Sequence, residues 1–199
     1  MHDDYELQEQ FDTLEFYVVW SIRYHQAREW FYEKIDWIAD FLTLFLTTAS
    51  VYKLLSSTTD EKVVGGVLVV ATASGLFRRL AHIPEKLSRH KTIAVQLGEL
   101  RQEISTLRQR DENAVRRLTS RYRSIQNTAP PTLPLLTDVC FNQTVVELER
   151  DPSTMVELNW LQRVFAHLGN FGYQSPPSRR GSLQDIAVNP FVRESGEKL

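Results

Sequence analysis

The sequence is poor in cysteine, and its first part lacks the residues that break helices. It contains one cysteine, Cys140, and neither glycine nor proline occurs before Gly65. A single cysteine excludes a disulfide within the chain and is typical of a reducing compartment. The long stretch without helix breakers predicts helix. Its start, Met1–Leu7, is acidic and poor in apolar residues, so we expect no cleavable signal peptide.

A strong excess of one charge is also absent, and so is any catalytic pattern. The net charge is −2, which gives no general attraction to nucleic acid, and we expect no nucleic-acid partner. The sequence has no glycine-rich phosphate loop and no metal-ligand spacing. Cys140 and His167 could be posed as a thiol–imidazole pair, but each lies in an apolar helical context. We expect no enzyme activity, no cofactor and no metal.

Two apolar stretches, Ile35–Leu55 and Val63–Leu80, dominate the first half of the chain, and the short polar link Ser56–Lys62 joins them. As helices they would be about 31 and about 27 Å long, close to the ~30 Å hydrocarbon core of a bilayer. Their uncharged parts, Phe41–Tyr52 and Val63–Phe77, are shorter, and such runs also occur as buried helices of soluble proteins.

The residues around these stretches favour membrane spans over a soluble helical bundle. Trp30, Trp37 and Tyr52 lie where aromatic belts form at membrane interfaces. Basic residues gather before the first stretch and after the second: Arg23, Arg28, Lys34, Arg78, Arg79, Lys86, Arg89 and Lys91. By the positive-inside rule, we expect a two-span hairpin in the cell (inner) membrane, with both termini cytoplasmic.

Polar residues of the first stretch recur at steps of three and four, which places them on one side of a helix: Asp36, Asp40, Thr43, Thr47 and Ser50. This polar stripe should face protein or an aqueous path, because polar groups in hydrocarbon need partners. Helix packing and the lining of a pore both fit this pattern. In an antiparallel hairpin, Asp40 and the pair Arg78 and Arg79 would reach the same membrane face.

The second stretch is rich in small residues that let helices approach closely, namely Gly65, Gly66, Ala71 and Gly75. We interpret them as helix-packing positions. Because one chain supplies only two spans, a useful membrane structure would need several copies, and we expect a homo-oligomer in the lipid bilayer.

Helices are predicted on both sides of the hairpin. Residues 1–34 contain an amphipathic cytosolic helix, on whose apolar face His25 lies far in sequence from other ligand-type residues. One long cytosolic helix is predicted over 84–127, beginning at Pro84. It carries a heptad seam of apolar residues: Ile93, Leu97, Leu100, Ile104, Leu107 and Leu118. This seam could pair between subunits or fold back on the first helix.

The rest of the chain divides at a proline-rich linker, residues 128–135. Beyond it, residues 136–170 predict two short helices, Leu136–Glu149 and Val156–Asn170, and the second has an apolar face that must dock somewhere. Residues 171–199 have the composition of a disordered tail. The predicted fold is therefore all-α: a membrane hairpin with a cytosolic bundle or coiled coil.

The layout resembles a known family. The segments W-S-I-R-Y-H-Q-A-R (Trp20–Arg28) and R-R-L-A-H-I-P-E-K-L-S-R-H-K-T-I-A-V-Q-L-G-E-L (Arg78–Leu100), with the hairpin between them, are similar to the SLATT group. These are bacterial two-transmembrane proteins of nucleotide-signalling conflict systems. His90, Leu97 and Leu100 fall where family members place a histidine and apolar residues in the long cytosolic helix.

A second resemblance concerns P-P-T-L-P-L-L-T-D-V-C-F-N-Q (Pro130–Gln143), which is similar to a tail of bacterial membrane proteins that often carries Cys-His-Asn-Glu. Here Phe141 and Gln143 replace the histidine and the glutamate. The SLATT resemblance implies an oligomeric effector of antiviral defence that forms a pore or perturbs the membrane when a cytosolic nucleotide-signalling or sensor protein signals. The alternative is a passive membrane-anchored scaffold that recruits a cytosolic partner.

Overall fold

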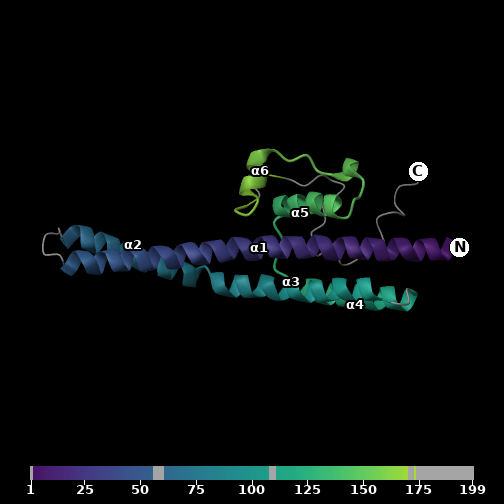
Figure 1. Cartoon of the computed structure of the whole chain (residues 1–199), viewed down its shortest axis with the longest axis horizontal. Helices are drawn as coiled ribbons and strands as arrows, with labels where there is room; N and C mark the ends of the chain where they lie inside the picture. Colours follow the sequence, from purple (N-terminus) through teal and green to yellow (C-terminus); the bar gives the residue numbers. More distant parts are fainter. Residues whose placement is uncertain (1, 56–60, 108–110, 170–172, 174–199) are drawn as a thin grey trace. The chain divides into compact units, whose positions relative to one another are not determined.

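The computed structural model describes residues 2–55, 61–107, 111–169 and 173, and its regular structure in those ranges is entirely helical (Figure 1). The all-α prediction is thus confirmed. The elements are α1 (His2–Leu55), α2 (Glu61–Leu80), α3 (Ile83–Thr106), α4 (Glu112–Asn127), α5 (Pro134–Glu147), the 3-10 turn η1 (Pro152–Thr154) and α6 (Trp160–Phe165). Most of the predicted link Ser56–Lys62, and the predicted tail 171–199 apart from Tyr173, lie outside the described residues.

The chain forms two compact units, and α1 contributes to both. The bundle unit comprises Met1–Ala27 and His90–Leu199, and the hairpin unit comprises Arg28–Arg89. No helix end marks the predicted boundary between residues 34 and 35, because α1 continues through it. The absence of glycine and proline before Gly65 accounts for this continuity.

In the bundle unit, α1, α3 and α4 meet in a first hydrophobic core. Phe11, Leu14 and Val18 of α1 are fully buried there. Their partners include the seam residues Ile93, Leu97, Leu100, Ile104 and Leu118, with Leu107 partly buried against the same cluster. These seam positions are therefore occupied within one chain. This is the fold-back arrangement and not the pairing between subunits that the heptad pattern also allowed.

The single long helix predicted over 84–127 is two helices in the structure. α3 ends at Thr106, and α4 begins at Glu112 after the N-cap residue Asp111. Asp111 has an extended backbone, and its carboxylate accepts a hydrogen bond from the Ala114 backbone N–H at 2.7 Å. Such a cap starts a new helix. The heptad phase continues through Asp111, so the periodicity alone could not reveal the break.

Ion pairs hold α4 back against α3. Glu103 accepts from Arg117 at 2.6 Å and from Arg121 at 2.5 Å, and Arg121 also reaches Glu99 at 3.3 Å. Residues close to the C-terminal end of α3 thus face the first turns of α4, as in an antiparallel pair. The charges of Arg117 and Arg121 on α4 are consequently neutralised within the chain.

A second cluster joins α5 to α1. The Trp20 indole donates to the Thr137 carbonyl at 2.9 Å, and the Leu133 backbone N–H donates to the Tyr24 hydroxyl at 3.0 Å. α5 begins at Pro134, inside the stretch predicted as linker, because proline suits the first turn of a helix. Its buried residues include Leu135 and Cys140.

The last predicted helix is much shorter than expected. α6 spans only Trp160–Phe165, and Asn159 caps it through a reciprocal pair of hydrogen bonds with Gln162. The extended segment before it, not a helix from Val156, is tied down where Asn142 bonds both the N–H and the C=O of Val156. The apolar residues predicted to dock stay exposed in the described chain: Leu161, Val164, Phe165 and Leu168.

In the hairpin unit, the second half of α1 and α2 run side by side (Figure 1). Ala39 and Ala71 are the buried small residues of this pair. After Leu80 the chain turns through His82, whose φ of 52° lies in the left-handed region. The His82 carbonyl then accepts from the Lys86 N–H at 3.0 Å and joins the first turn of α3.

Candidate functional site

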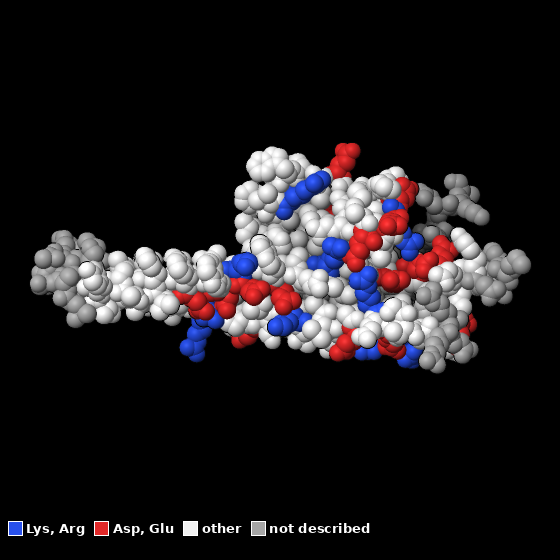
Figure 2. Space-filling view, viewed as in Figure 1, with Lys and Arg blue, Asp and Glu red and all other residues white. Residues whose placement is uncertain are grey.

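The hairpin unit has a large apolar surface that the packing of its own helices leaves exposed. Leu44 is 71% exposed and Val69 is 68% exposed, although each is apolar. The other large apolar side chains exposed on this unit include Trp37, Ile38, Phe41, Leu42, Phe45, Val51, Leu68, Val70, Leu76, Phe77 and Leu80. On the face that Figure 2 shows, the described part of the hairpin is a white surface, with charged residues toward its base. Patches of this kind mark sites of contact with a protein or a membrane.

Length and apolarity do not by themselves identify a membrane span. Within the described residues no single helix meets both requirements for crossing a bilayer. One pair does so together, Gly65–Leu80 followed by Ile83–Thr106, with a bend at the break between them. The hairpin of two spans therefore remains a prediction.

At the base of the hairpin, one arginine binds two carboxylates. Arg78 donates to both oxygens of Asp36, at 2.5 Å from Nε and at 3.0 Å from Nη2, and its Nη1 donates to Asp40. Asp36 and Asp40 lie one turn apart on α1, so a single guanidinium of α2 reaches both. This bidentate geometry lowers the cost of charged groups beside an apolar surface. Asp40 and Arg78 thus lie at the same level of the hairpin, as an antiparallel pair requires.

Higher on the hairpin, the polar stripe divides into an inward and an outward part. The Thr43 hydroxyl lies 2.7 Å from the Ser74 hydroxyl of α2, so Thr43 belongs to the helix contact. Thr47 is exposed, and its hydroxyl donates to the Thr43 carbonyl at 2.6 Å. The side chain of Ser50 lies outside the described residues. Packing therefore accounts for Asp36 and Thr43, whereas Thr47 remains open to solvent, lipid or another subunit.

Of the small residues predicted to pack helices, Ala71 alone is buried among the described residues. It is buried, whereas Gly65, Gly66 and Gly75 are exposed. A Cβ added at any of these three glycines would meet no atom within 4 Å. The close approach expected of the glycines is thus not made inside the described hairpin.

Cys140, which the sequence analysis considered as a partner of His167, is buried on α5. Burial raises the pKa of the Cys140 thiol to about 12, so the nucleophilic thiolate is scarce at neutral pH. Among the described residues, no three His, Cys, Asp or Glu side chains are grouped closely enough to hold a metal ion.

A buried histidine pair in the bundle unit was missed by the sequence analysis. His25 of α1 and His90 of α3 are 0% and 3% exposed, and their Nδ1 atoms lie 2.8 Å apart. The Tyr24 ring packs edge-on against His25 at 5.4 Å between centroids. Burial, and then the neighbouring His90, lower the pKa of His25 to about 3. His25 and His90 are 65 positions apart along the chain, so His25 looks isolated in the sequence. The fold nevertheless pairs the two rings.

The proton on this pair can be placed by chemistry. His25 Nε2 is buried and has no hydrogen-bond partner. A buried N–H without an acceptor costs more than a bare nitrogen lone pair, so His25 carries its proton on Nδ1 and donates it to His90 Nδ1. A proton added at His90 Nδ1 would set two N–H groups against each other and break this bond, whereas a proton added at His25 Nε2 would create a buried N–H without an acceptor.

Comparisons of the chain with protein-family models, with curated proteins and with solved structures found no match.

Proposed function

We propose that this chain is an integral membrane effector. The hairpin formed by residues 35–55 and α2 inserts into a bilayer, and both termini remain on the cytoplasmic side. Several copies then assemble and form a pore or perturb the membrane in response to a cytosolic signal. The observation that carries the proposal is the apolar surface of the hairpin unit, which the packing of α1 against α2 leaves exposed.

Two features support membrane insertion over simple association with a protein. Arg78 lies between Asp36 and Asp40 at the hairpin base, and beyond that cluster no charged residue interrupts Phe41–Tyr52 or Val63–Phe77. The charges thus stand where an interface would lie, and the apolar surface lies where hydrocarbon would be. The resemblance to the SLATT group favours the same assignment.

The arrangement of polar groups is consistent with an assembly around the hairpins. The seam residues are buried within one chain, so subunits would meet through the hairpins instead of through α3. Thr47 and the exposed glycines of α2 are available for such contacts. Close packing at glycines with Thr47 toward an aqueous path would place polar groups on the inside of the assembly.

A membrane-anchored scaffold is the second candidate, and the short helix α6 favours it. Trp160, Leu161 and Val164 are exposed on the bundle unit and would suit a cytosolic protein partner. A scaffold would use the same hairpin only as an anchor, so the two functions differ in whether the membrane becomes leaky.

The first prediction tests insertion. Leu44→Arg is expected to release the protein from the membrane fraction after alkaline extraction, because Arg at the centre of a span costs about 2.5–3.5 kcal/mol. The matched control is Val146→Arg on α5, whose wild-type side chain is 65% exposed in the bundle unit. That variant should stay with the membrane. Release of the wild-type protein, or equal retention of both variants, would reject the hairpin as a membrane span.

The orientation has an independent readout. A reporter fused after Leu199 should behave as cytoplasmic, and one inserted between Ser57 and Thr58 should behave as external. If both reporters are cytoplasmic, the hairpin does not cross the membrane.

The second prediction separates effector from scaffold. Thr47→Leu should suppress the ion leak or growth arrest that overexpression causes, because a hydroxyl would be lost from the water-lined face. Thr48→Leu is the matched control: Thr48 is also exposed and bonds its own helix, at 2.8 Å from the Leu44 carbonyl, but it lies off the stripe. This control should keep the leak. A wild-type protein that inserts but causes no leak would support the scaffold instead.

A further inference from the structure

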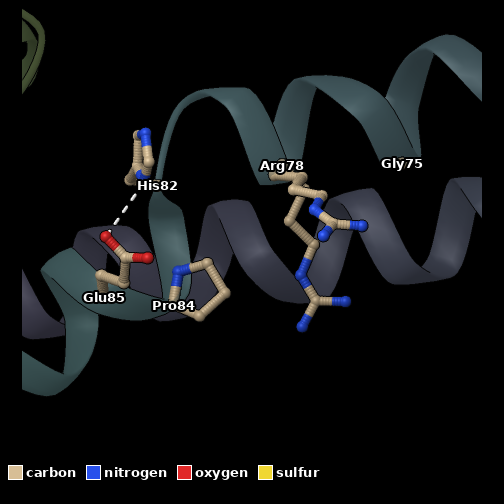
Figure 3. A pocket seen from close by; sticks show the side chains of 6 residues that line it. Gly75, Arg78, His82, Pro84 and Glu85 are labelled. Atoms are coloured by element: carbon tan, nitrogen blue, oxygen red, sulfur yellow. Dashed lines mark hydrogen bonds and ion pairs between the residues drawn. The ribbon is translucent and has the colours of Figure 1, made fainter.

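A pocket of about 310 Å³ lies at the base of the hairpin, where α2 passes into α3. Its lining consists of Gly75, Arg78, Arg79, His82, Pro84 and Glu85. Figure 3 shows Arg78 on one side of the pocket and the bonded pair His82 and Glu85 on the other, with the Pro84 ring between them. All of these residues belong to the hairpin unit.

The two arginines of the pocket are in different states. Arg78 is engaged by Asp36 and Asp40, which leaves little of its charge for a ligand. Arg79 is exposed, and its guanidinium makes no ion pair or hydrogen bond with the other described residues. Arg79 is therefore the guanidinium that can bind a phosphate group.

The carboxylate of Glu85 decides the class of ligand. Its Oε2 lies 2.9 Å from His82 Nδ1, and its side chain is 78% exposed, so it can still accept from a ligand. The arginines of the pocket give a charge of +2, and Asp36, Asp40 and Glu85 give −3, for a sum of −1. A purely anionic ligand is not favoured by such a balance. This balance instead favours a zwitterion, whose phosphate would bind Arg79 and whose ammonium would bind Glu85.

The surroundings indicate a lipid. Leu76, Phe77 and Leu80 are exposed on the same turns of α2 as the pocket, so acyl chains would find apolar surface directly beside it. Gly75 lies one turn before Arg79 and carries no side chain that could fill the space. We infer that this pocket binds the headgroup of a phospholipid with a primary ammonium, such as phosphatidylethanolamine, through Arg79 and Glu85. This inference rests on the proposed membrane insertion.

The choice of a primary ammonium follows from hydrogen bonding. A primary ammonium donates three hydrogen bonds and can bond the Glu85 carboxylate directly. The quaternary ammonium of phosphatidylcholine has no N–H to donate, and phosphatidylglycerol has no cation. The pocket should therefore discriminate among three headgroups that share the same phosphodiester.

The test uses the full chain in a neutral detergent, with native mass spectrometry to count bound lipid. Short-chain phosphatidylethanolamine, phosphatidylcholine and phosphatidylglycerol are titrated separately, and phosphoethanolamine serves as the headgroup without acyl chains. The ethanolamine lipid should bind about tenfold more tightly than the other two lipids, as one charge-assisted hydrogen bond allows. Phosphoethanolamine should bind more weakly than the lipid, and equal binding of the two would overturn the lipid as ligand.

Four variants assign the contacts. Glu85→Gln should bring the ratio of ethanolamine lipid to choline lipid close to one, and Arg79→Gln should weaken both about tenfold. Gly75→Leu should block the pocket without a clash, because a Cβ at this position meets no atom within 4 Å. Lys86→Gln is the control: Lys86 is exposed one residue from Glu85 but does not line the pocket, and its loss should change nothing.

The outcomes separate this inference from the proposed function. A chain that stays in the membrane fraction but binds the three lipids equally overturns the headgroup site and leaves the effector intact. If Arg79→Gln and Lys86→Gln weaken binding alike, the attraction is general charge and the pocket is not the site. If the wild-type chain is released from membranes, the proposed function fails, whatever the lipids do.

Discussion

Leu100→Asp is expected to unfold the bundle unit. Leu100 is 0% exposed in the core formed by α1, α3 and α4. The substitution removes an apolar side chain and leaves a carboxylate buried without a partner, which costs about 4 kcal/mol or more. Because domains are stable by only about 5–15 kcal/mol, little stability would remain.

The measurement is urea unfolding followed by circular dichroism, with limited proteolysis of residues 90–169 as a second readout. Val95→Asp is the matched control, since Val95 lies on the same helix and is 55% exposed. It should lower stability by less than about 1 kcal/mol. If Leu100→Asp instead yields a folded chain of smaller assembly size, the seam joins subunits and the core described for one chain is wrong.

Acidification from pH 7.5 to pH 5 is expected to destabilise the bundle unit by about 2 kcal/mol through the histidine pair. The pKa of His25 is about 3 in the folded chain, against 6.5 for an ordinary histidine. Between these values the unfolded chain binds more protons than the folded one. The stability contributed by neutral His25 is therefore complete above pH 6.5 and is lost as the pH falls, at about 1.4 kcal/mol per pH unit.

The variant His25→Asn isolates this effect. Its amide N–H can still donate toward His90 Nδ1, but it does not titrate, so the pH dependence of the unfolding free energy should become flatter even if the variant is less stable at pH 7.5. His82→Asn is the control, because His82 is exposed and, in the described part of the chain, its side chain bonds Glu85 alone. An unchanged pH dependence in His25→Asn would show that this ring does not control acid stability.

What the sequence determined by itself about this protein is local. The absence of glycine and proline before Gly65 predicted the helix that became α1, and the apolar run after Ser56 predicted α2. The steps of three and four predicted which side chains of α3 are buried, and Leu97 and Leu100 are completely so. A helix depends on neighbouring residues and its periodicity defines a face, so both can be inferred without knowing what lies opposite.

Only the tertiary structure decided what each face meets. The seam pattern was compatible with a second subunit or with α1, and the break at Asp111 lay in phase with the heptads, so neither the partner nor the turn could be inferred. In the hairpin, Thr43 and Thr47 looked equivalent, yet only Thr43 reaches Ser74 of α2. The contact of His25 with His90 likewise joins helices whose relative rotation no local pattern encodes. Such contacts depend on how helices distant in sequence are rotated and offset against each other, and packing of the whole core determines this.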